Sequence, residues 1–388
     1  MPQIAGFRGA LWNASKVDLA KVASAPIKTA KDLLADGTLV QDPTRAMYLY
    51  HQLFTLGGRT VTRATLLAAV RLAPWAEGSV RPHEETNAKA LQSAISGIEA
   101  AGAYTEAVFA GYRDAAREVD RLMRGIDGSR PVLEATTPDG TNHRIWRVSN
   151  AEIIGKLRTL FAPKKLHVLD GHARYEGMLA HAAKLGADSQ PQYSSAKYGL
   201  ACLVNLEDPA LVLAPRHRIV RGENVTRDAV LASAKTFFIV DKLTGGAKDL
   251  ARQQAALDDT VAHQPAFVCT FAGDADAWKL TLKPDVSPVG EGVSVHRALQ
   301  KYDPIVLEHM FLARSAPGAA AVTERSAAAV HTAVASGAQL GIIMRPLTLE
   351  QVIHTDELSA LLPFGSTAFT PPLANLVSLF VNPDEDLV

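Results

Sequence analysis

The sequence predicts a mixed α/β protein, and three observations lead to this class. Segments with the pattern of β-strands are interspersed with segments whose apolar residues recur every three to four positions, as in helices. At residues 166–186 a strand passes through Asp-Gly directly into a helix, as strand–helix units of α/β folds do. Apolar residues make up 47% and charged residues 21% of the 388 residues, which is typical of a folded globular chain.

The individual elements follow from local periodicity and from the residues that end them. Alternating or continuous apolar residues predict strands at 47–50, 63–71, 143–148, 166–169, 198–206, 219–220, 266–271, 278–282, 341–344 and 376–381. Helical spacing predicts helices at 91–101, 113–123, 150–161, 225–237 and 347–353, and between Gly171 and Gly186. Gly102 ends the first helix, and Pro138-Asp139-Gly140-Thr141 is typical of a hairpin turn.

Composition excludes several classes of protein. Forty Lys and Arg balance 40 Asp and Glu, and no basic stripe is present, which disfavours a protein whose affinity comes from DNA or RNA phosphates. Two cysteines, Cys202 and Cys269, do not make a zinc site or a disulfide framework. Without a signal peptide or an apolar run of the ~20 residues that a membrane helix needs, we expect a cytoplasmic protein with no membrane partner.

The junction at Asp170-Gly171-His172-Ala173-Arg174 carries the sharpest chemical signal. A glycine permits a tight turn, and the start of the following helix presents backbone N–H groups that favour anions. Arg174 adds a guanidinium suited to phosphate or carboxylate, and His172 can donate a hydrogen bond or a proton near neutral pH. The alternative is structural: Asp170 caps the helix, His172 is exposed, and Arg174 pairs with a surface carboxylate.

The second signal is His83-Glu84-Glu85-Thr86, at the start of a helix. Two carboxylates beside a histidine can supply a general base or a Mg²⁺ ligand. The alternative is ordinary helix initiation, in which acidic residues complement the helix dipole. The segment lacks the second histidine of HExxH, and the chain has no GxxxxGK[ST] loop, GxSxG elbow or GxGxxG after a strand. A nucleotide would therefore be bound by something other than a Walker loop or a Rossmann turn.

Four ordered segments make the chain resemble a family along nearly its whole length. They are Ala25-Pro26-Ile27-Lys28, the segment 83–86, the segment 168–174 and the segment 362–372. They resemble the APPYD, HExT, IADGHHR and MPPKSTWFxPK segments of the domain-of-unknown-function family ten-fifteen. The DGHHR element is similar in turn to the nucleotide-binding turn of the ParB/sulfiredoxin superfamily, which includes free-serine kinases. We therefore expect phosphate binding by Gly171, His172 and Arg174.

The resemblance also implies an organisation of the chain. It implies a ParB/sulfiredoxin-like nucleotide-binding core with mixed sheets at 136–240, an N-terminal α/β region at 1–135 that holds the HEET segment, and a C-terminal α/β region at 241–388 that packs back on the core. A length of 388 residues allows two or three domains, since roughly 100–200 residues per domain is usual. Oligomeric state is not predicted by the sequence.

The chain departs from the family pattern at four positions that carry reactive side chains. Ala173 replaces the second histidine of DGHHR, and Lys28 or Thr29 stands where APPYD has its aspartate. Gly365 replaces the lysine of KST, and Pro372 replaces the final lysine. Loss of one catalytic group commonly costs several orders of magnitude in rate, so these changes bear directly on turnover.

Two functions are consistent with these residues. The first is an ATP- or ADP-dependent phosphotransferase acting on a small hydroxylated metabolite such as a serine-like amino acid. Gly171, His172 and Arg174 would then hold phosphates, Asp170 or Glu84 would bind Mg²⁺, and Glu84 or Glu85, beside His83, would deprotonate the acceptor. Ser366 and Thr367 would contact substrate; their alternative role is hydrogen bonding within a turn. The second function is a nucleotide-binding regulatory or scaffold protein that has lost catalysis.

Overall fold

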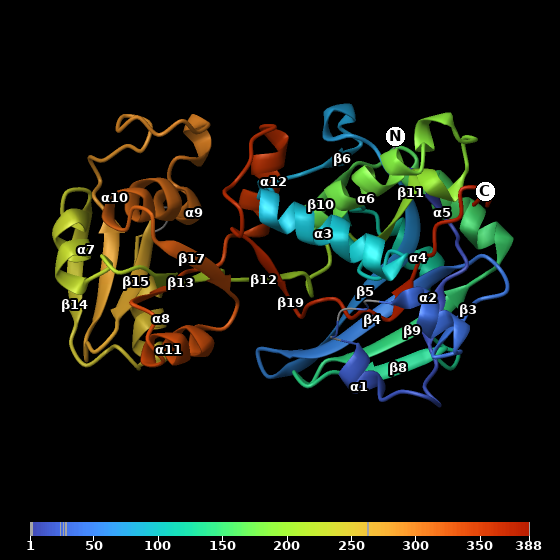
Figure 1. Cartoon of the computed structure of the whole chain (residues 1–388), viewed down its shortest axis with the longest axis horizontal. Helices are drawn as coiled ribbons and strands as arrows, with labels where there is room; N and C mark the ends of the chain where they lie inside the picture. The colour runs from blue at the N-terminus through green and yellow to red at the C-terminus, as the bar shows by residue number, and fades with distance from the viewer. Residues whose placement is uncertain (1–2, 24, 26, 28, 262–263, 388) are drawn as a thin grey trace. The chain divides into compact units, whose positions relative to one another are not determined.

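The computed structural model describes residues 3–23, 25, 27, 29–261 and 264–387. It is a mixed α/β protein, as the sequence predicts (Figure 1). Two compact units are present. Unit 1 contains residues 1–82, 86–212 and 369–388, and unit 2 contains residues 83–85 and 213–368. Unit 1 is thus assembled from three separate pieces of sequence.

Unit 1 is built on a nine-stranded mixed sheet in the order β6-β10-β7-β11-β5-β4-β9-β8, with β1 paired to β5. The strands are β1 (Ile4–Ala5), β4 (Met47–Leu56), β5 (Arg59–Arg71), β6 (Val80–Arg81), β7 (Val108–Tyr112), β8 (Leu133–Thr136), β9 (Asn142–Val148), β10 (Leu166–Asp170) and β11 (Tyr198–Asn205). The pairs β6/β10 and β7/β11 are parallel, and the other pairs are antiparallel. A small sheet, β20-β2-β3, consists of β2 (Ala10–Trp12), β3 (Leu39–Gln41) and β20 (Val377–Ser378).

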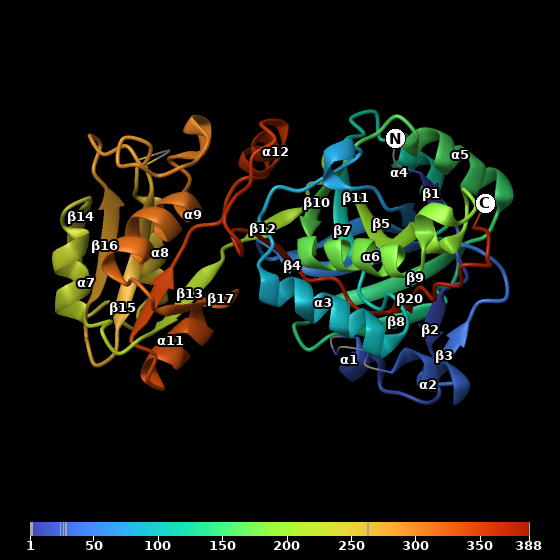
Figure 2. The same ribbon diagram turned by 45° about the horizontal axis from the view of Figure 1, so that its top comes forward.

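The helices of unit 1 have local causes in the sequence. They are α1 (Leu19–Val22), α2 (Ala30–Ala35), α3 (Ala88–Ala101), α4 (Glu118–Met123), α5 (Ala151–Phe161) and α6 (His172–Lys184). Asn87 and Asn150 cap α3 and α5 through their side-chain oxygens, and Gly102 ends α3 in the left-handed conformation. The helices α3 and α6 lie side by side in both views (Figures 1 and 2) and are in contact. Gly177 permits this approach, since a Cβ there would lie 3.1 Å from Ala94 Cβ.

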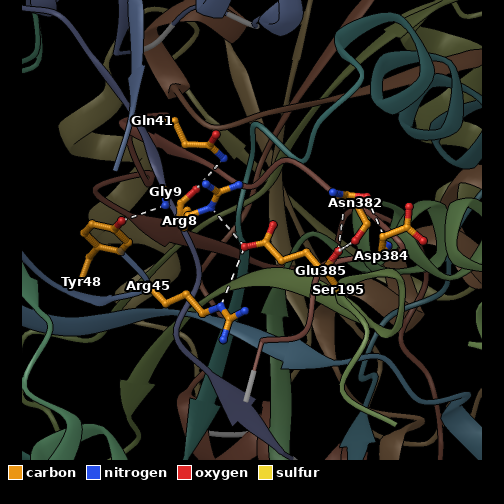
Figure 3. Close-up of polar contacts among 9 residues, drawn as sticks. All are labelled: Arg8, Gly9, Gln41, Arg45, Tyr48, Ser195, Asn382, Asp384 and Glu385. Atoms are coloured by element: carbon orange, nitrogen blue, oxygen red, sulfur yellow. Dashed lines mark hydrogen bonds and ion pairs between the residues drawn. The ribbon is translucent and has the colours of Figure 1, made fainter. Parts of the chain in front are cut away.

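The C-terminal residues of the chain pack on unit 1 through a polar cluster (Figure 3). Glu385 forms ion pairs with Arg8 and Arg45, at N–O distances of 3.1 and 3.8 Å. The buried Ser195 Oγ donates to Asn382 O at 2.6 Å and accepts from Asn382 N at 2.9 Å. These contacts join the last piece of unit 1 to the first and the second pieces.

Unit 2 contains a six-stranded antiparallel sheet in the order β14-β16-β15-β18-β13-β17. Its strands are β13 (His217–Arg221), β14 (Phe238–Leu243), β15 (Ala266–Phe271), β16 (Ala277–Leu282), β17 (Ala320–Glu324) and β18 (Leu340–Ile343). Its helices are α7 (Arg227–Ala234), α8 (Leu250–Asp258), α9 (Asp303–Ile305), a π-helical segment (Val306–Leu312), α10 (Ala313–Ser315), α11 (Ala327–Ala335) and α12 (Leu349–Glu357). Phe238, Phe267 and Phe311 meet ring to ring in its core. A two-stranded sheet pairs β12 (Val212–Ala214) with β19 (Ala368–Thr370).

The expected helix at 113–123 is wrong in its first half. The structure has only α4 at Glu118–Met123, because Arg117 takes a left-handed conformation with φ of 51°. The buried Asp114 side chain accepts a hydrogen bond from Val119 N at 2.9 Å and stabilises a turn in place of helix. The expected strand at 376–381 is reduced to the two residues of β20.

Two further expectations concern the environment of the chain. Among the residues that the structure describes, no helix combines the length and apolar character needed to cross a membrane. Cys202 and Cys269 are both buried free thiols.

Candidate functional site

The junction between β10 and α6 has the predicted strand–turn–helix geometry. Residues 166–169 of β10 are buried, and Asp170 follows a register shift against β7. Gly171 has φ of 97°, a conformation that L-residues with a side chain rarely adopt. No N-cap side chain accepts a hydrogen bond from the backbone N–H groups in the first turn of α6. In α3 and α5, by contrast, Asn87 and Asn150 accept such bonds.

Arg174 folds back over this turn. A Cβ built on Gly171 would lie 2.7 Å from Arg174 Nε and 2.8 Å from Nη2, so the glycine leaves the space that the guanidinium fills. Arg174 Nη1 donates to Glu106 Oε2 at 3.2 Å, and Nη2 lies 3.6 Å from Asp170 Oδ1. Arg174 Nε is buried and has no hydrogen-bond partner.

The positive charge of Arg174 is therefore already more than compensated at this corner. Two carboxylates, Asp170 and Glu106, face one guanidinium whose side chain is 30% exposed. An incoming phosphate would compete with these carboxylates for Arg174, while the helix N-terminus would favour it by about 0.3–1 kcal/mol. Glu106 is a residue that sequence reasoning missed, because a lone glutamate ahead of β7 carries no motif.

A cavity of about 470 Å³, the α3–α6 cavity, borders the same corner of unit 1. Small side chains of α3 and the first residues of α6 form much of its wall. Its lining comprises Ile27, Ala90, Ser93, Ala94, Gly97, Ile98, Ala100, Tyr104, Thr105, Glu106, Ala173, Arg174 and Met178. Ala173, which stands where the family pattern has its second histidine, is thus part of the cavity wall. The volume falls in the range of small-molecule sites, about 300–1,000 Å³.

His172 begins α6 and is buried, with 7% of its surface exposed. This differs from the exposed histidine of the structural alternative. The sequence-predicted residues Asp170, Gly171, His172 and Arg174 therefore belong to one turn of unit 1.

The segment His83-Glu84-Glu85 belongs to unit 2, where it contacts the loop at 362–367. Glu84 Oε1 accepts from Gly365 N at 2.7 Å, and Oε2 accepts from Ser366 N at 3.0 Å and from Thr367 N and Oγ1 at 3.1 Å. Burial raises the pKa of Glu84, and hydrogen bonds from Gly365 and Thr367 oppose that rise. Glu85, by contrast, is exposed.

The hydroxyls expected to contact substrate are engaged inside unit 2. Ser366 Oγ donates to Pro363 O at 2.6 Å. Thr367 Oγ1 donates to Glu84 and lies 2.9 Å from His83 Nε2. Ser366 and Thr367 are 6% and 8% exposed. The Ser366 contact lies within a turn, whereas the Thr367 hydroxyl joins the loop to His83 and Glu84, more than 280 positions earlier in the sequence.

Neither the surroundings of Asp170 nor those of Glu84 fit a Mg²⁺ ion. Within the described part of the chain, no group of three or more His, Cys, Asp or Glu side chains is arranged to hold a metal ion. The Glu84 oxygens already accept four hydrogen bonds, and Asp170 faces Arg174.

The APPYD-like segment is only partly described. Pro26 and Lys28 lie outside the described residues. Ile27 lines the α3–α6 cavity, and Thr29 precedes α2.

Comparison with solved structures gives distant likenesses. A conserved hypothetical protein from Pyrococcus furiosus has 13% identity and a TM-score of 0.41, with 77% of this chain and 90% of that chain covered. A free serine kinase in complex with AMP has 14% identity and a TM-score of 0.39, with 80% and 90% covered. SbnI with a C-terminal truncation, from Staphylococcus aureus, has 12% identity and a TM-score of 0.40, with 82% and 90% covered.

Comparison at the sequence level is more decisive. No curated protein matches the chain. The model of the family described as "Protein of unknown function (DUF1015)" matches residues 13–305, which include the segments at 83–86 and 168–174 but not the segment at 362–372. Because the match covers well over half of the 388 residues, the chain belongs to the DUF1015 family.

Proposed function

We propose that this protein binds ATP or ADP in unit 1, with the phosphates at Gly171–Arg174 and the nucleoside in the α3–α6 cavity. The observation that carries the proposal is the position of Arg174. Its Nε is buried without a hydrogen-bond partner, and its side chain lines a cavity of nucleotide size. A phosphate oxygen is a strong acceptor for such a donor.

Three features of the turn support the same assignment. Gly171 brings the backbone close to Arg174, and α6 starts without a side-chain cap. Helix starts of this kind bind anions through backbone N–H groups. Glu106 and Asp170 hold Arg174 in place and would yield part of the guanidinium to the phosphates.

The reaction class proposed for this site is phosphoryl transfer to a small hydroxylated acceptor, with a serine-like amino acid as the first choice. The acceptor oxygen forms a bond to the terminal phosphorus, the bridging P–O bond breaks, and the nucleotide leaves with one phosphate fewer. The hydroxyl proton goes to a general base. Positioning and charge stabilisation contribute most to such transfers.

Nucleotide binding without turnover is the second candidate, and a specific observation favours it. The four hydrogen bonds to Glu84 leave it little capacity to accept a substrate proton. Ala173 also removes the imidazole that the family pattern has beside the phosphates. In this form the protein is a nucleotide-dependent regulatory or scaffold component. In both forms we propose a cytoplasmic protein that does not bind nucleic acid.

Calorimetric titration with ATP and ADP tests the shared part of both candidates. We expect saturable binding by the wild type and at least a tenfold weaker affinity, about 1.4 kcal/mol, for Arg174→Ala. Arg130→Ala, which removes an exposed arginine of unit 1, is the matched control and should bind like the wild type. Equal affinity of Arg174→Ala and wild type, or no binding of either nucleotide, would overturn both candidates.

A measurement of turnover then separates the two candidate functions. Nucleotide conversion that requires a hydroxylated amino acid supports phosphotransfer. Tight binding with no conversion across a panel of hydroxylated acceptors supports the regulatory function.

A further inference from the structure

Unit 2 contains a second cavity that has no part in the proposed nucleotide site. It has a volume of about 470 Å³ and lies between the segment 301–303 and the start of α12. We call it the Lys301–Arg345 pocket. Its lining comprises Lys301, Tyr302, Asp303, Arg345, Pro346, Leu347, Thr348, Glu350, Gln351 and His354.

A rigid ion pair forms part of this wall. Arg345 Nε and Nη2 donate to the two oxygens of Asp303, each at 3.0 Å. Nη2 also donates to Gln264 O at 2.8 Å, and Asp303 Oδ1 accepts from Ala266 N at 3.3 Å. Both partners are thus fixed to the strand β15 and the residues before it, so the guanidinium has one defined orientation.

Arg345 keeps donor capacity for a ligand. Its Nη1 makes no hydrogen bond to any part of the chain that the structure describes, whereas Nε and Nη2 are both engaged. The side chain is 21% exposed. Because one edge of the guanidinium is already held, binding an anion at its remaining N–H groups costs little further side-chain entropy. The planar guanidinium also matches the geometry of planar anions.

Other groups of the wall have compatible chemistry. Lys301 and His354 are exposed residues that make no ion pair among the described residues, so their donors are available to a ligand. The hydroxyl-bearing Tyr302 and the amide Gln351 are further polar groups of the wall. Glu350 is the one lining carboxylate besides Asp303, whose charge Arg345 already balances.

The pocket is backed by a small apolar core that fixes its two sides. Leu299, Ile305, Leu347, Val352 and Leu362 are buried together, with Tyr302 packed against them. A capping box at Thr348 and Gln351 fixes the start of α12 in addition. The lining residues are therefore positioned before any ligand arrives.

We propose that the Lys301–Arg345 pocket binds a small organic anion, whose carboxylate or phosphate group pairs with Arg345 Nη1 and Lys301. The volume lies in the range of sites for metabolite-sized ligands, about 300–1,000 Å³. Carboxylate and phosphate ligands have one property in common: each carries an anionic group, planar or tetrahedral, on a small polar molecule. The site is independent of nucleotide binding in unit 1.

Binding isotherms for the full chain test the proposal with four probes: citrate, glutamate, glycerol 3-phosphate and inorganic phosphate. We expect saturable binding of at least one organic probe by the wild type. Lys301→Ala should weaken that binding at least tenfold, while Lys248→Ala, at an exposed lysine outside the pocket, should leave it unchanged. A preference for citrate or glutamate identifies a carboxylate ligand, and a preference for glycerol 3-phosphate identifies a phosphate ester.

Three outcomes would overturn this site: no binding of any organic probe at millimolar concentration, binding of inorganic phosphate alone, or equal affinity of Lys301→Ala and wild type. Arg174→Ala should retain the anion binding. A loss there would instead place the anion in unit 1, so failure of this proposal is distinguishable from failure of the proposed function.

Discussion

Arg174 occupies the space beside Gly171 so closely that a Cβ on Gly171 would lie 2.7 Å from Arg174 Nε. The two residues therefore form one structural element: the glycine allows the turn, and the arginine covers it. The guanidinium that is proposed to bind phosphate depends on the absence of a side chain three residues earlier.

Gly171→Ala should consequently displace Arg174 and destabilise unit 1. A non-glycine residue at φ of 97° costs about 1–3 kcal/mol, and the contact with the guanidinium adds to that cost. The free energy of unfolding measured in urea should fall by this amount, and nucleotide affinity should fall with it. The matched control is Gly155→Ala on the exposed face of α5, where an added Cβ would meet nothing within 4 Å. This substitution should increase stability by about 0.5–1 kcal/mol. Equal effects of the two substitutions would contradict the role assigned to Gly171.

Glu84→Gln should destabilise unit 2, because the amide group can replace only part of the carboxylate. One of its atoms becomes an N–H₂ donor facing the backbone N–H groups of residues 365–367. Since hydrogen bonds to a charged acceptor contribute about 1.5–3 kcal/mol, we expect a loss of about 2–4 kcal/mol. Hydrogen exchange at the backbone amides of β16, measured at a series of denaturant concentrations, reports on this unit.

Glu85→Gln is the matched control for this substitution. Glu85 is exposed, so its stability effect should stay within about 0.5 kcal/mol. A variant Glu84→Gln as stable as Glu85→Gln would show that Glu84 does not anchor the loop.

His143 should make unit 1 sensitive to acid. Its Nδ1 lies 2.7 Å from the Tyr50 hydroxyl and its Nε2 lies 2.9 Å from Thr137 Oγ1. Burial lowers the pKa of His143 to about 4, against an opposing effect of Asp139. Between pH 6.5 and 4 the unfolded state binds a proton that the folded state does not, so stability falls as pH falls.

The size of this effect follows from linkage. The His143 contribution corresponds to a loss of about 2 kcal/mol between neutral pH and pH 5. Urea denaturation at a series of pH values should show it, and His143→Gln should reduce the slope by about one proton. A pH slope that is the same in His143→Gln and wild type would contradict this account.

The contacts of the polar cluster in Figure 3 should contribute unequally to the stability of unit 1: the ion pairs of Glu385 weakly, and the hydrogen bonds of Ser195 strongly. Glu385→Gln removes ion pairs with two arginines that are 41% and 42% exposed, so it should cost less than about 1 kcal/mol and respond to salt. Ser195→Ala leaves Asn382 O and N without their buried partner and should cost about 1–3 kcal/mol at any salt concentration. Denaturant titrations at low and high salt compare the two, and the reverse ranking would contradict the structure.

Local signals in the sequence predicted much of the fold. The strands β4 and β5, the capped helix α5 and the hairpin β15/β16 each carry their own periodicity and end residues, so a short window is enough to find them. The strand β7 was missed, since all five of its residues are buried and nothing in its sequence alternates. It is a strand because it lies between β10 and β11, and its neighbours are distant in sequence.

The candidate site also has parts that the sequence predicted and parts that it did not. The turn at Gly171 could be predicted, because strand, glycine and helix are consecutive. The hydrogen bonds of Glu84 could not, since its acceptor role depends on residues 281–283 positions away. The Arg174–Glu106 pair, 68 positions apart, was unpredictable for the same reason.

The division of unit 1 into three pieces of sequence has a consequence for biosynthesis. Residues 369–388, which supply β20 and Glu385, leave the ribosome after every residue of unit 2. Unit 2 can therefore complete its sheet during translation while the earlier-made strands of unit 1 still lack their final partner. A chain that ends at residue 368 and has been released from the ribosome should accordingly expose unit 1 to protease and chaperones while unit 2 is protected.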